Sequence, residues 1–374
     1  MTTIPSLSFS DVILRGFERL KLSPWWVFVV VLAFNVVINF GFVIIFDAWG
    51  PVQTRTGEIS LGFSQEPAGW AIDFLAQPMV FAMAMWLQNA GEGMMSSLLR
   101  DGHVIPHPGV HDALAWGRRK LQSKFLFIAA GITSFVVQSF VVLLETGYLG
   151  DHNPTWVNVH PAIFLTRSIV ALFAYYFLAV IVFSLAIIIM TLNRIMKIDN
   201  VVNIKIYHPD DAGGLGAIGR FMANIGYLVF TFGMVVVMLF VQARIFSGFN
   251  TGWLIAASVG LAAYTLVSPV FFLWPLLSTH RAMLKYRDQL LLTISAEINE
   301  ICHQTIQNKN DDSPNARFTR LKQLEELYKL TQKYPTWPFG TPNLRKYSTL
   351  TLSPVLSFVM GLAVNWVYDL IFRS

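Results

Sequence analysis

The sequence predicts an all-α polytopic membrane protein with seven transmembrane helices and a cytoplasmic antiparallel helical hairpin. Hydrophobic residues make up 54% of the 374 residues and charged residues only 13%, about half the charged fraction of a typical soluble domain. Several apolar runs reach about 20 residues, the length needed to cross a hydrocarbon layer of roughly 30 Å. A long charged stretch with helical periodicity separates the last two runs.

Residues 1–22 are predicted to form an N-terminal amphipathic helix at the membrane surface. Phe9, Ile13 and Phe17 fall on one helical face, and Ser10 can cap the start of the helix. The apolar run that follows is too long for a signal-peptide core, and no small-residue cleavage site comes after it. It is therefore interpreted as a retained first span.

Seven apolar runs are assigned as spans, and the first six form a transmembrane region over 23–277. The second run is more polar than the others because it contains Asp73, Gln77 and Pro78. The runs cover 25–47, 70–91, 125–147, 163–190, 220–244, 253–275 and 349–372.

The distribution of basic residues predicts the orientation. With the N-terminus in the cytoplasm and the C-terminus outside, only Arg55, Arg167, Arg244 and Arg373 of the 27 lysines and arginines face outward. This satisfies the positive-inside rule for a protein of the inner (plasma) membrane. The same placement of basic residues beside the spans accounts for the positive net charge. The lipid bilayer is therefore the expected partner, and nucleic acid is not.

Residues 278–334 are predicted to form the cytoplasmic hairpin. One helix extends to about Asn308, and a second occupies 316–333. Apolar residues repeat at helical spacing on both, which predicts antiparallel pairing. Leu327 and Leu330 widen the apolar face and leave surface for a second copy or another partner, so a homo-oligomer is expected. Residues 335–374 then hold a proline-rich return to the membrane and the last span.

Polar residues in or beside the spans are candidates for lining a pore, because such groups are costly in hydrocarbon and usually face protein or water. Asn35 and Asn39 share one face of the first span, and the others follow the second span. The candidates are Asn35, Asn39, Gln77, Gln88, Asn89 and Glu92. The alternative is that each residue only makes a hydrogen bond between helices.

The stretch from Ile204 to Gly219 is the most unusual one on the cytoplasmic side. Its candidate ligand or capping residues are His208, Asp210, Asp211, Gly213 and Gly214. A histidine and two aspartates form a reasonable metal-ligand set, although further ligands would have to come from elsewhere. In the structural alternative, an aspartate caps the next helix and the glycines allow close backbone packing. A dinucleotide-binding loop is excluded because these glycines lead directly into a span.

Three histidines four residues apart, His103, His107 and His111, suggest a histidine box at first sight. Pro106, Pro108 and Gly109 interrupt the segment, so a solvated loop is predicted instead of a helix. We expect no cofactor, since no histidine lies within a span and no phosphate-binding loop is present.

Three stretches carry a family resemblance: His208 to Leu215 (HPDxxGGL), Pro275 to Met283, and Pro335 to Phe339 (PTWPF). They resemble sequences of an uncharacterised group of prokaryotic multi-pass membrane proteins. The resemblance covers roughly the C-terminal half. It implies the multi-pass architecture and assigns a role to no residue.

The function that the sequence favours is a homo-oligomeric ion-conducting channel, in which amide side chains line the path and Glu92 forms a charged ring near the inner mouth. One alternative is a signalling or defence-type membrane protein that binds a protein or small ligand at the cytoplasmic stretch around His208. Another is a secondary transporter with a broken helix at Gln77-Pro78 or Ser268-Pro269. An enzyme is not expected, because no catalytic motif is present.

Overall fold

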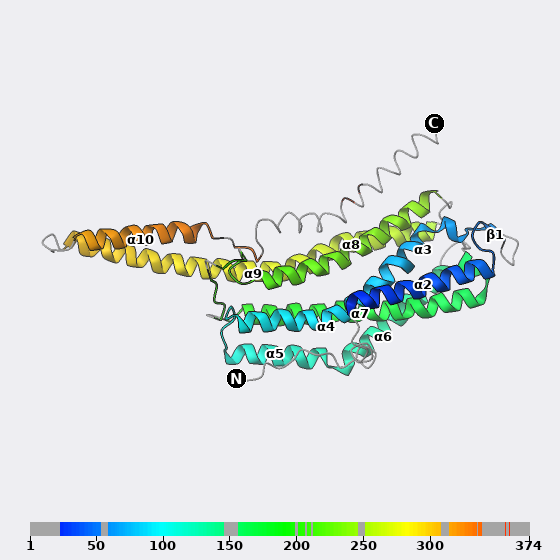
Figure 1. The fold of residues 1–374 in the computed structure, drawn as a ribbon, viewed down its shortest axis with the longest axis horizontal. Helices are drawn as coiled ribbons and strands as arrows, with labels where there is room; N and C mark the ends of the chain where they lie inside the picture. The colour runs from blue at the N-terminus through cyan, green and yellow to red at the C-terminus, as the bar shows by residue number, and fades with distance from the viewer. Residues whose placement is uncertain are drawn as a thin grey trace, which may run out of the picture.

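The computed structural model describes residues 23–53, 59–145, 156–198, 201–205, 208–210, 212–245, 251–307, 314–334, 336–338, 356 and 359. These residues are mostly helical (Figure 1). The main helices are α2 (Pro24–Ile45), α3 (Pro67–Ala71), α4 (Gln77–Arg100), α5 (Pro108–Leu121), α6 (Lys124–Glu145), α7 (Pro161–Met196), α8 (Gly216–Ile245), α9 (Thr251–Gln307) and α10 (Pro314–Gln332). The shorter elements are β1 (Val52–Gln53), β2 (Ile59–Ser60), the 3₁₀ turns η1 (Phe63–Gln65) and η3 (Trp156–Val159), and the π-helical turn η2 (Ile72–Ala76).

Five helical segments of the described chain are long and apolar enough to cross a membrane. They are α2, the continuous segment from α3 through α4, α6, α7 and α8. Each coincides with one of the first five predicted spans. The sixth predicted run lies in the first part of α9. The predicted N-terminal helix in 1–22 and nearly all of the last run, 349–372, lie outside the described residues.

Proline and a capping side chain define the starts of α2 and α7. The Ser23 hydroxyl accepts a hydrogen bond from the Trp26 backbone N–H at 3.4 Å, and Pro24 follows at the first helical position. At α7, the Nδ1 atom of His160 accepts from the Ala162 backbone N–H at 3.2 Å, ahead of Pro161. Proline is favoured at this position because the missing N–H has no partner in the helix anyway.

The same arrangement makes the loop predicted around the three histidines partly wrong. His103 lies outside a helix, but α5 begins at Pro108 and contains His111. His107 is the N-cap, and its Nδ1 accepts from the Gly109 backbone N–H at 3.1 Å. Pro106 and Pro108 therefore end one segment and start another instead of preventing helix formation.

The largest apolar core lies where α4, α5, α7 and α8 meet. Leu87, Leu98, Phe177 and Met222 are among its fully buried side chains. By contrast, α2 and α6 expose most of their apolar side chains in the single chain. Such a surface requires lipid or another apolar surface around it.

The segment between α2 and α4 folds over one end of the bundle. β1 pairs antiparallel with β2, Val52 opposite Ser60 and Gln53 opposite Ile59. Phe63 lies at the centre of an aromatic group and contacts the ring of Trp156 edge-on, with 5.3 Å between ring centroids. These contacts bring η3 against the start of α3.

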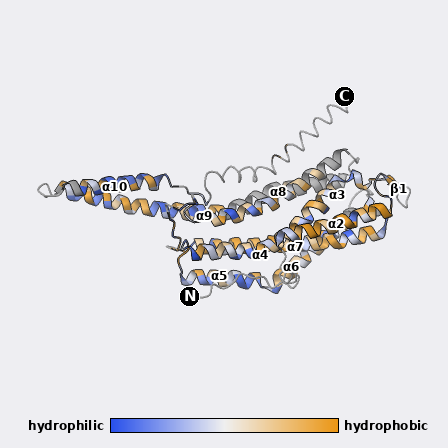
Figure 2. Ribbon diagram, viewed as in Figure 1, coloured by the Kyte–Doolittle hydropathy of each residue, from blue (hydrophilic) through white to orange (hydrophobic). Residues whose placement is uncertain are grey.

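α9 is one continuous helix of 57 residues, and α10 lies along its distal part (Figure 1). Arg320 of α10 donates a hydrogen bond to Glu297 of α9 at 2.7 Å. In the distal part of the pair, Ile294, Leu324 and Thr331 are buried, while more than half of the other described side chains are exposed. Figure 2 shows hydrophilic residues predominating in this pair and hydrophobic ones in α2, α6 and α7.

Candidate functional site

The two asparagines of α2 belong to a buried polar cluster between helices of one chain. Asn35 lies halfway along α2 and donates to the Gln77 side-chain oxygen at 2.9 Å and to the backbone carbonyl of Asp73. Asn39 donates to the Asn35 carbonyl at 2.9 Å. Both side chains are 3% exposed. The structure thus brings Asn35, Asn39 and Gln77 together.

An ion pair completes this cluster. Arg167 of α7 donates to an Asp73 carboxylate oxygen at 2.8 Å, and Gln77 donates to the other oxygen at 3.1 Å. The Arg167 guanidinium also lies 3.8 Å from Glu66, which accepts from the Trp156 indole N–H at 3.0 Å. Buried charges require such partners because their desolvation is costly. The group Asn35, Asn39, Glu66, Asp73, Gln77 and Arg167 is called the buried polar cluster below.

A break in helical geometry carries Asp73 into the cluster. Residues Ile72–Ala76 form a π-helical turn between α3 and α4, and Pro78 is the second residue of α4. Proline has no N–H to donate to the carbonyl four residues earlier, so the regular ladder is interrupted there. Single π turns within helices are frequent at functional sites.

The remaining pore candidates occupy another part of α4. Asn89 lies about 18 Å along the helix from Gln77, by the usual rise of 1.5 Å per residue. Its side chain is exposed, and that of Glu92 is half-buried. Neither joins the buried polar cluster. The side chain of Gln88 lies outside the described part of the chain.

Asp210 occupies a helix-capping position at the start of α8. Its carboxylate accepts hydrogen bonds from the backbone N–H groups of Ala212, Gly214 and Gly216 at 2.9–3.0 Å. Burial opposes ionisation of this carboxyl, but the three backbone hydrogen bonds, with help from His208, prevail and lower its pKa. The Nδ1 atom of His208 lies 2.7 Å from an Asp210 oxygen.

The glycines after Asp210 allow three distant segments to meet. Gly213 and Gly214 have φ angles of +64° and +91°. A Cβ atom at Gly214 would collide with the ring of His103, and one at Gly213 with the Tyr334 hydroxyl. The loop after α4, the start of α8 and the end of α10 are therefore in direct contact here. We call these residues, with His208 and Asp210, the α8 corner.

The α8 corner contains no metal-ligand set among the described residues. Nowhere in the described ranges do three or more His, Cys, Asp or Glu side chains come together as a possible metal site. The third metal candidate, Asp211, lies outside the described residues. His208 and Asp210 instead contact each other, and His208 packs edge-on against His103 with ring centroids 4.9 Å apart.

No protein-family model, curated protein or solved structure matches this chain. The candidate sites are therefore argued from their own geometry.

In the sequence, Asp73 is only a polar residue within an apolar run, and Arg167 is expected on the outer side of the membrane. The structure joins them across 94 positions of sequence. An aspartate within an apolar run and an arginine near the start of another were the available signals, since such charges usually pair. Nothing in the local pattern of either run indicated which charge would meet which.

Proposed function

We propose that the chain is a subunit of a homo-oligomeric ion-conducting channel in the inner (plasma) membrane. The proposal keeps seven spans, a cytoplasmic N-terminus, an outward C-terminus and a cytoplasmic α9–α10 hairpin. The main support is an open polar face on α4, and the buried polar cluster gives further support.

The feature that carries the proposal is an open polar face on the second half of α4. Ala82 and Met85 are buried, whereas Asn89, Gly93 and Arg100 on the same helical face are exposed. Gly93 has no atom within 4 Å of where a Cβ would lie. Glu92 adjoins this face, half-buried and with no ion pair among the described residues. A polar face that one chain leaves uncovered is suited to an aqueous path between copies.

The buried polar cluster supports the proposal by fixing α4 in place. It ties the start of α4 to α2 through Asn35 and Gln77 and to α7 through Asp73 and Arg167. Charged groups inside a bundle of candidate spans are costly, and they commonly pair and mark ion or substrate pathways. The open polar face is thereby held at a fixed position beyond the cluster.

Conductance of the purified protein in planar bilayers tests this function. Glu92→Gln removes one negative charge per subunit near the inner mouth, so cation conductance should fall about twofold or more at 0.1 M salt. The difference should fade at 1 M, where the Debye length shortens from about 10 Å to 3 Å.

Asp112→Asn is the matched control. Asp112 is an exposed acid on α5 and does not belong to the polar face of α4. The Asp112→Asn substitution removes the same charge as Glu92→Gln but at a residue outside the proposed path. The conductance of this variant should therefore equal that of the wild type at both salt concentrations. Equal effects of the two substitutions, or none from either, would contradict a conduction path beside Glu92.

A secondary transporter is the second candidate function, and the broken helix before Pro78 favours it. Transporter sites form where interrupted helices place polar groups near the bilayer midplane. In the buried polar cluster, the Asn39 side-chain oxygen is buried and has no hydrogen-bond partner among the described residues. Together with the Asp73 carboxylate it offers oxygen ligands to a small cation.

Ion flux into sealed vesicles separates the two functions. A transporter would show saturable flux without unitary currents, and Asp73→Asn would abolish that flux while Glu92→Gln would leave it nearly unchanged. Discrete currents that respond to Glu92→Gln would favour the channel.

A further inference from the structure

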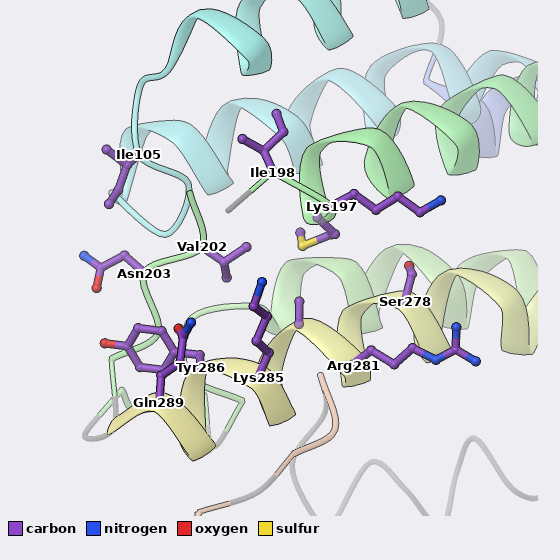
Figure 3. A pocket seen from close by; sticks show the side chains of 12 residues that line it. Ile105, Lys197, Ile198, Val202, Asn203, Ser278, Arg281, Lys285, Tyr286 and Gln289 are labelled. Carbon is purple, nitrogen blue, oxygen red and sulfur yellow. The ribbon is translucent and has the colours of Figure 1, made fainter. Parts of the chain in front are cut away.

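A cleft of about 340 Å³ lies where α9 passes the end of α7 and the segment leading toward α8 (Figure 3). Its floor is the part of α9 from Ser278 to Gln289, and its other walls come from Ile105, from Met196–Ile198 at the end of α7, and from Val202 and Asn203. The cleft is separate from the buried polar cluster and from the open face of α4.

Three basic side chains line this cleft, and its described lining includes no aspartate or glutamate. They are Lys197 at the end of α7 and Arg281 and Lys285 on α9. Several basic residues of α9 and α10 outside the cleft do pair with acids: Arg287 with Asp288, Arg320 with Glu297 and Lys329 with Glu325. Lys197 and Arg281 form no ion pair with any described residue. Lys197 and Arg281 therefore bring two positive charges to the cleft that no described acidic side chain pairs with.

The donors are arranged on one helical face. Ser278, Arg281 and Lys285 are spaced three and four residues apart, which places them on the same side of α9. In Figure 3, Lys285 rises from α9 toward Val202, while Lys197 and Arg281 extend toward one side of the view. A planar guanidinium fork, ammonium groups and a hydroxyl form the donor set that binds phosphate oxygens.

The surroundings of the cleft fit a phosphate that carries an apolar portion. Met196, Ile198 and Val202 give it an apolar wall beside the basic groups. Trp274, 60% exposed, lies one turn of α9 before Ser278, where the sequence predicts the exit from the bilayer. Tryptophan is enriched at the level of lipid headgroups, and basic pockets between helices at this level bind anionic headgroups.

We propose that this cleft binds a phosphate-bearing anion through Lys197, Arg281 and Lys285. A phosphate group could come from the headgroup of an anionic phospholipid or from a soluble phosphate ester, and the chemistry of recognition is the same for both. The proposal is independent of ion conduction.

Thermal unfolding of the purified full chain in neutral detergent, titrated with defined anions, tests this site. Phosphatidylglycerol is the lipid probe, phosphatidylcholine its uncharged counterpart, and glycerol 3-phosphate the soluble probe. We expect phosphatidylglycerol to raise the unfolding temperature at concentrations where phosphatidylcholine does not. The double substitution Arg281→Gln with Lys285→Gln should weaken the affinity for phosphatidylglycerol on the order of 30-fold, at about 1 kcal/mol per basic residue. The same rise in unfolding temperature should then need correspondingly more lipid.

The double substitution Arg119→Gln with Lys322→Gln is the control, because both residues are exposed and lie away from the cleft. It makes the same change in net charge and should leave the titration unchanged. If the cleft variant does not fold, Lys197→Gln on α7 replaces it and should weaken binding about fivefold. Stabilisation by glycerol 3-phosphate alone would assign a soluble ligand. No stabilisation by either anion, or equal losses in cleft and control variants, would overturn the proposal.

Discussion

Gly214 is a residue of the α8 corner that leaves no room for a side chain. Its φ of +91° disfavours any side chain, and a Cβ there would collide with the ring of His103. Left-handed backbone costs about 1–2 kcal/mol and overpacking about 1–3 kcal/mol, so Gly214→Ala should destabilise the protein by roughly 2–5 kcal/mol. Thermal unfolding in detergent measures the loss.

Gly131→Ala is the matched control, since Gly131 lies in α6 and has no atom within 4 Å of its Cβ position. It should be neutral or slightly stabilising, because alanine favours helix more than glycine does. Adding His103→Ala to Gly214→Ala should restore part of the stability if the collision is the cause. A Gly214→Ala protein as stable as the wild type would contradict the described packing.

His103 should make the stability of the α8 corner depend on pH. His103 is 2% exposed, and its burial, followed by electrostatic interactions with His208 and Lys205, lowers its pKa below the usual 6.5. The unfolded chain therefore binds a proton that the folded chain excludes, and stability falls as pH drops below 6.5 toward the folded pKa. The slope of this contribution is at most about 1.4 kcal/mol per pH unit.

Unfolding temperatures at pH 5 to 8 measure this effect. His103→Gln removes the titrating ring, so the variant should be less stable overall but should show a flatter profile between pH 5 and 7. Asp210 cannot produce the same slope, because its pKa is lowered from 3.8 and its contribution is lost only as pH falls through that lower value. Identical slopes in variant and wild type would assign the pH dependence to another group.

At the scale of the element, the distal α9–α10 pair is held together by few buried side chains. Leu324 of α10 is 3% exposed, while Leu330 on the same helix is 48% exposed. Leu324→Ala should therefore lower the free energy of opening of α10 by about 2–4 kcal/mol, and Leu330→Ala by well under 1 kcal/mol. Hydrogen exchange of the α10 amides measures both.

Equal exchange rates in the two variants would show that Leu324 does not anchor α10. The ion pair of Arg320 with Glu297 does not replace this anchor, because both side chains are about half exposed and such pairs contribute about 1 kcal/mol at most.

The sequence predicts helices well where apolar periodicity or an uninterrupted apolar run is long. The predicted runs 25–47 and 125–147 correspond to α2 and α6 within two residues at each end. Two features escape this reasoning. α5 is short and begins at Pro108 within a segment read as a loop, and the π-helical turn at Ile72–Ala76 depends on Pro78 and on contacts from α2 and α7.

At the scale of the whole molecule, side-chain partners were harder to predict than elements. The shared helical face of Asn35 and Asn39 predicts that they act together, and the structure does bury them together. The polar character of the second run also points to their partner Gln77, but no sequence pattern points to Arg167 or Glu66 as partners. A local pattern gives the direction of a polar side chain on its own helix, whereas its partner depends on how distant helices pack.

The orientation of the molecule remains a prediction, and the chain contains its own reporter for it. Cys302 is the only cysteine in the 374 residues and is exposed on α9. If the α9–α10 hairpin is cytoplasmic, a membrane-impermeant maleimide should leave the protein unlabelled in intact cells and label it once the membrane is opened. Mass spectrometry of the purified chain measures the labelled fraction.

Two cysteine variants make this test of orientation decisive. Cys302→Ser should remain unlabelled in both states, which shows that the signal comes from one thiol. Adding Gln53→Cys to that background places an exposed thiol in β1, on the side predicted to face outward, so intact cells should label it. Labelling of Cys302 in intact cells would invert the topology. The basic cleft beside Trp274 would then face outward, and Glu92 would lie at the outer mouth of the proposed path.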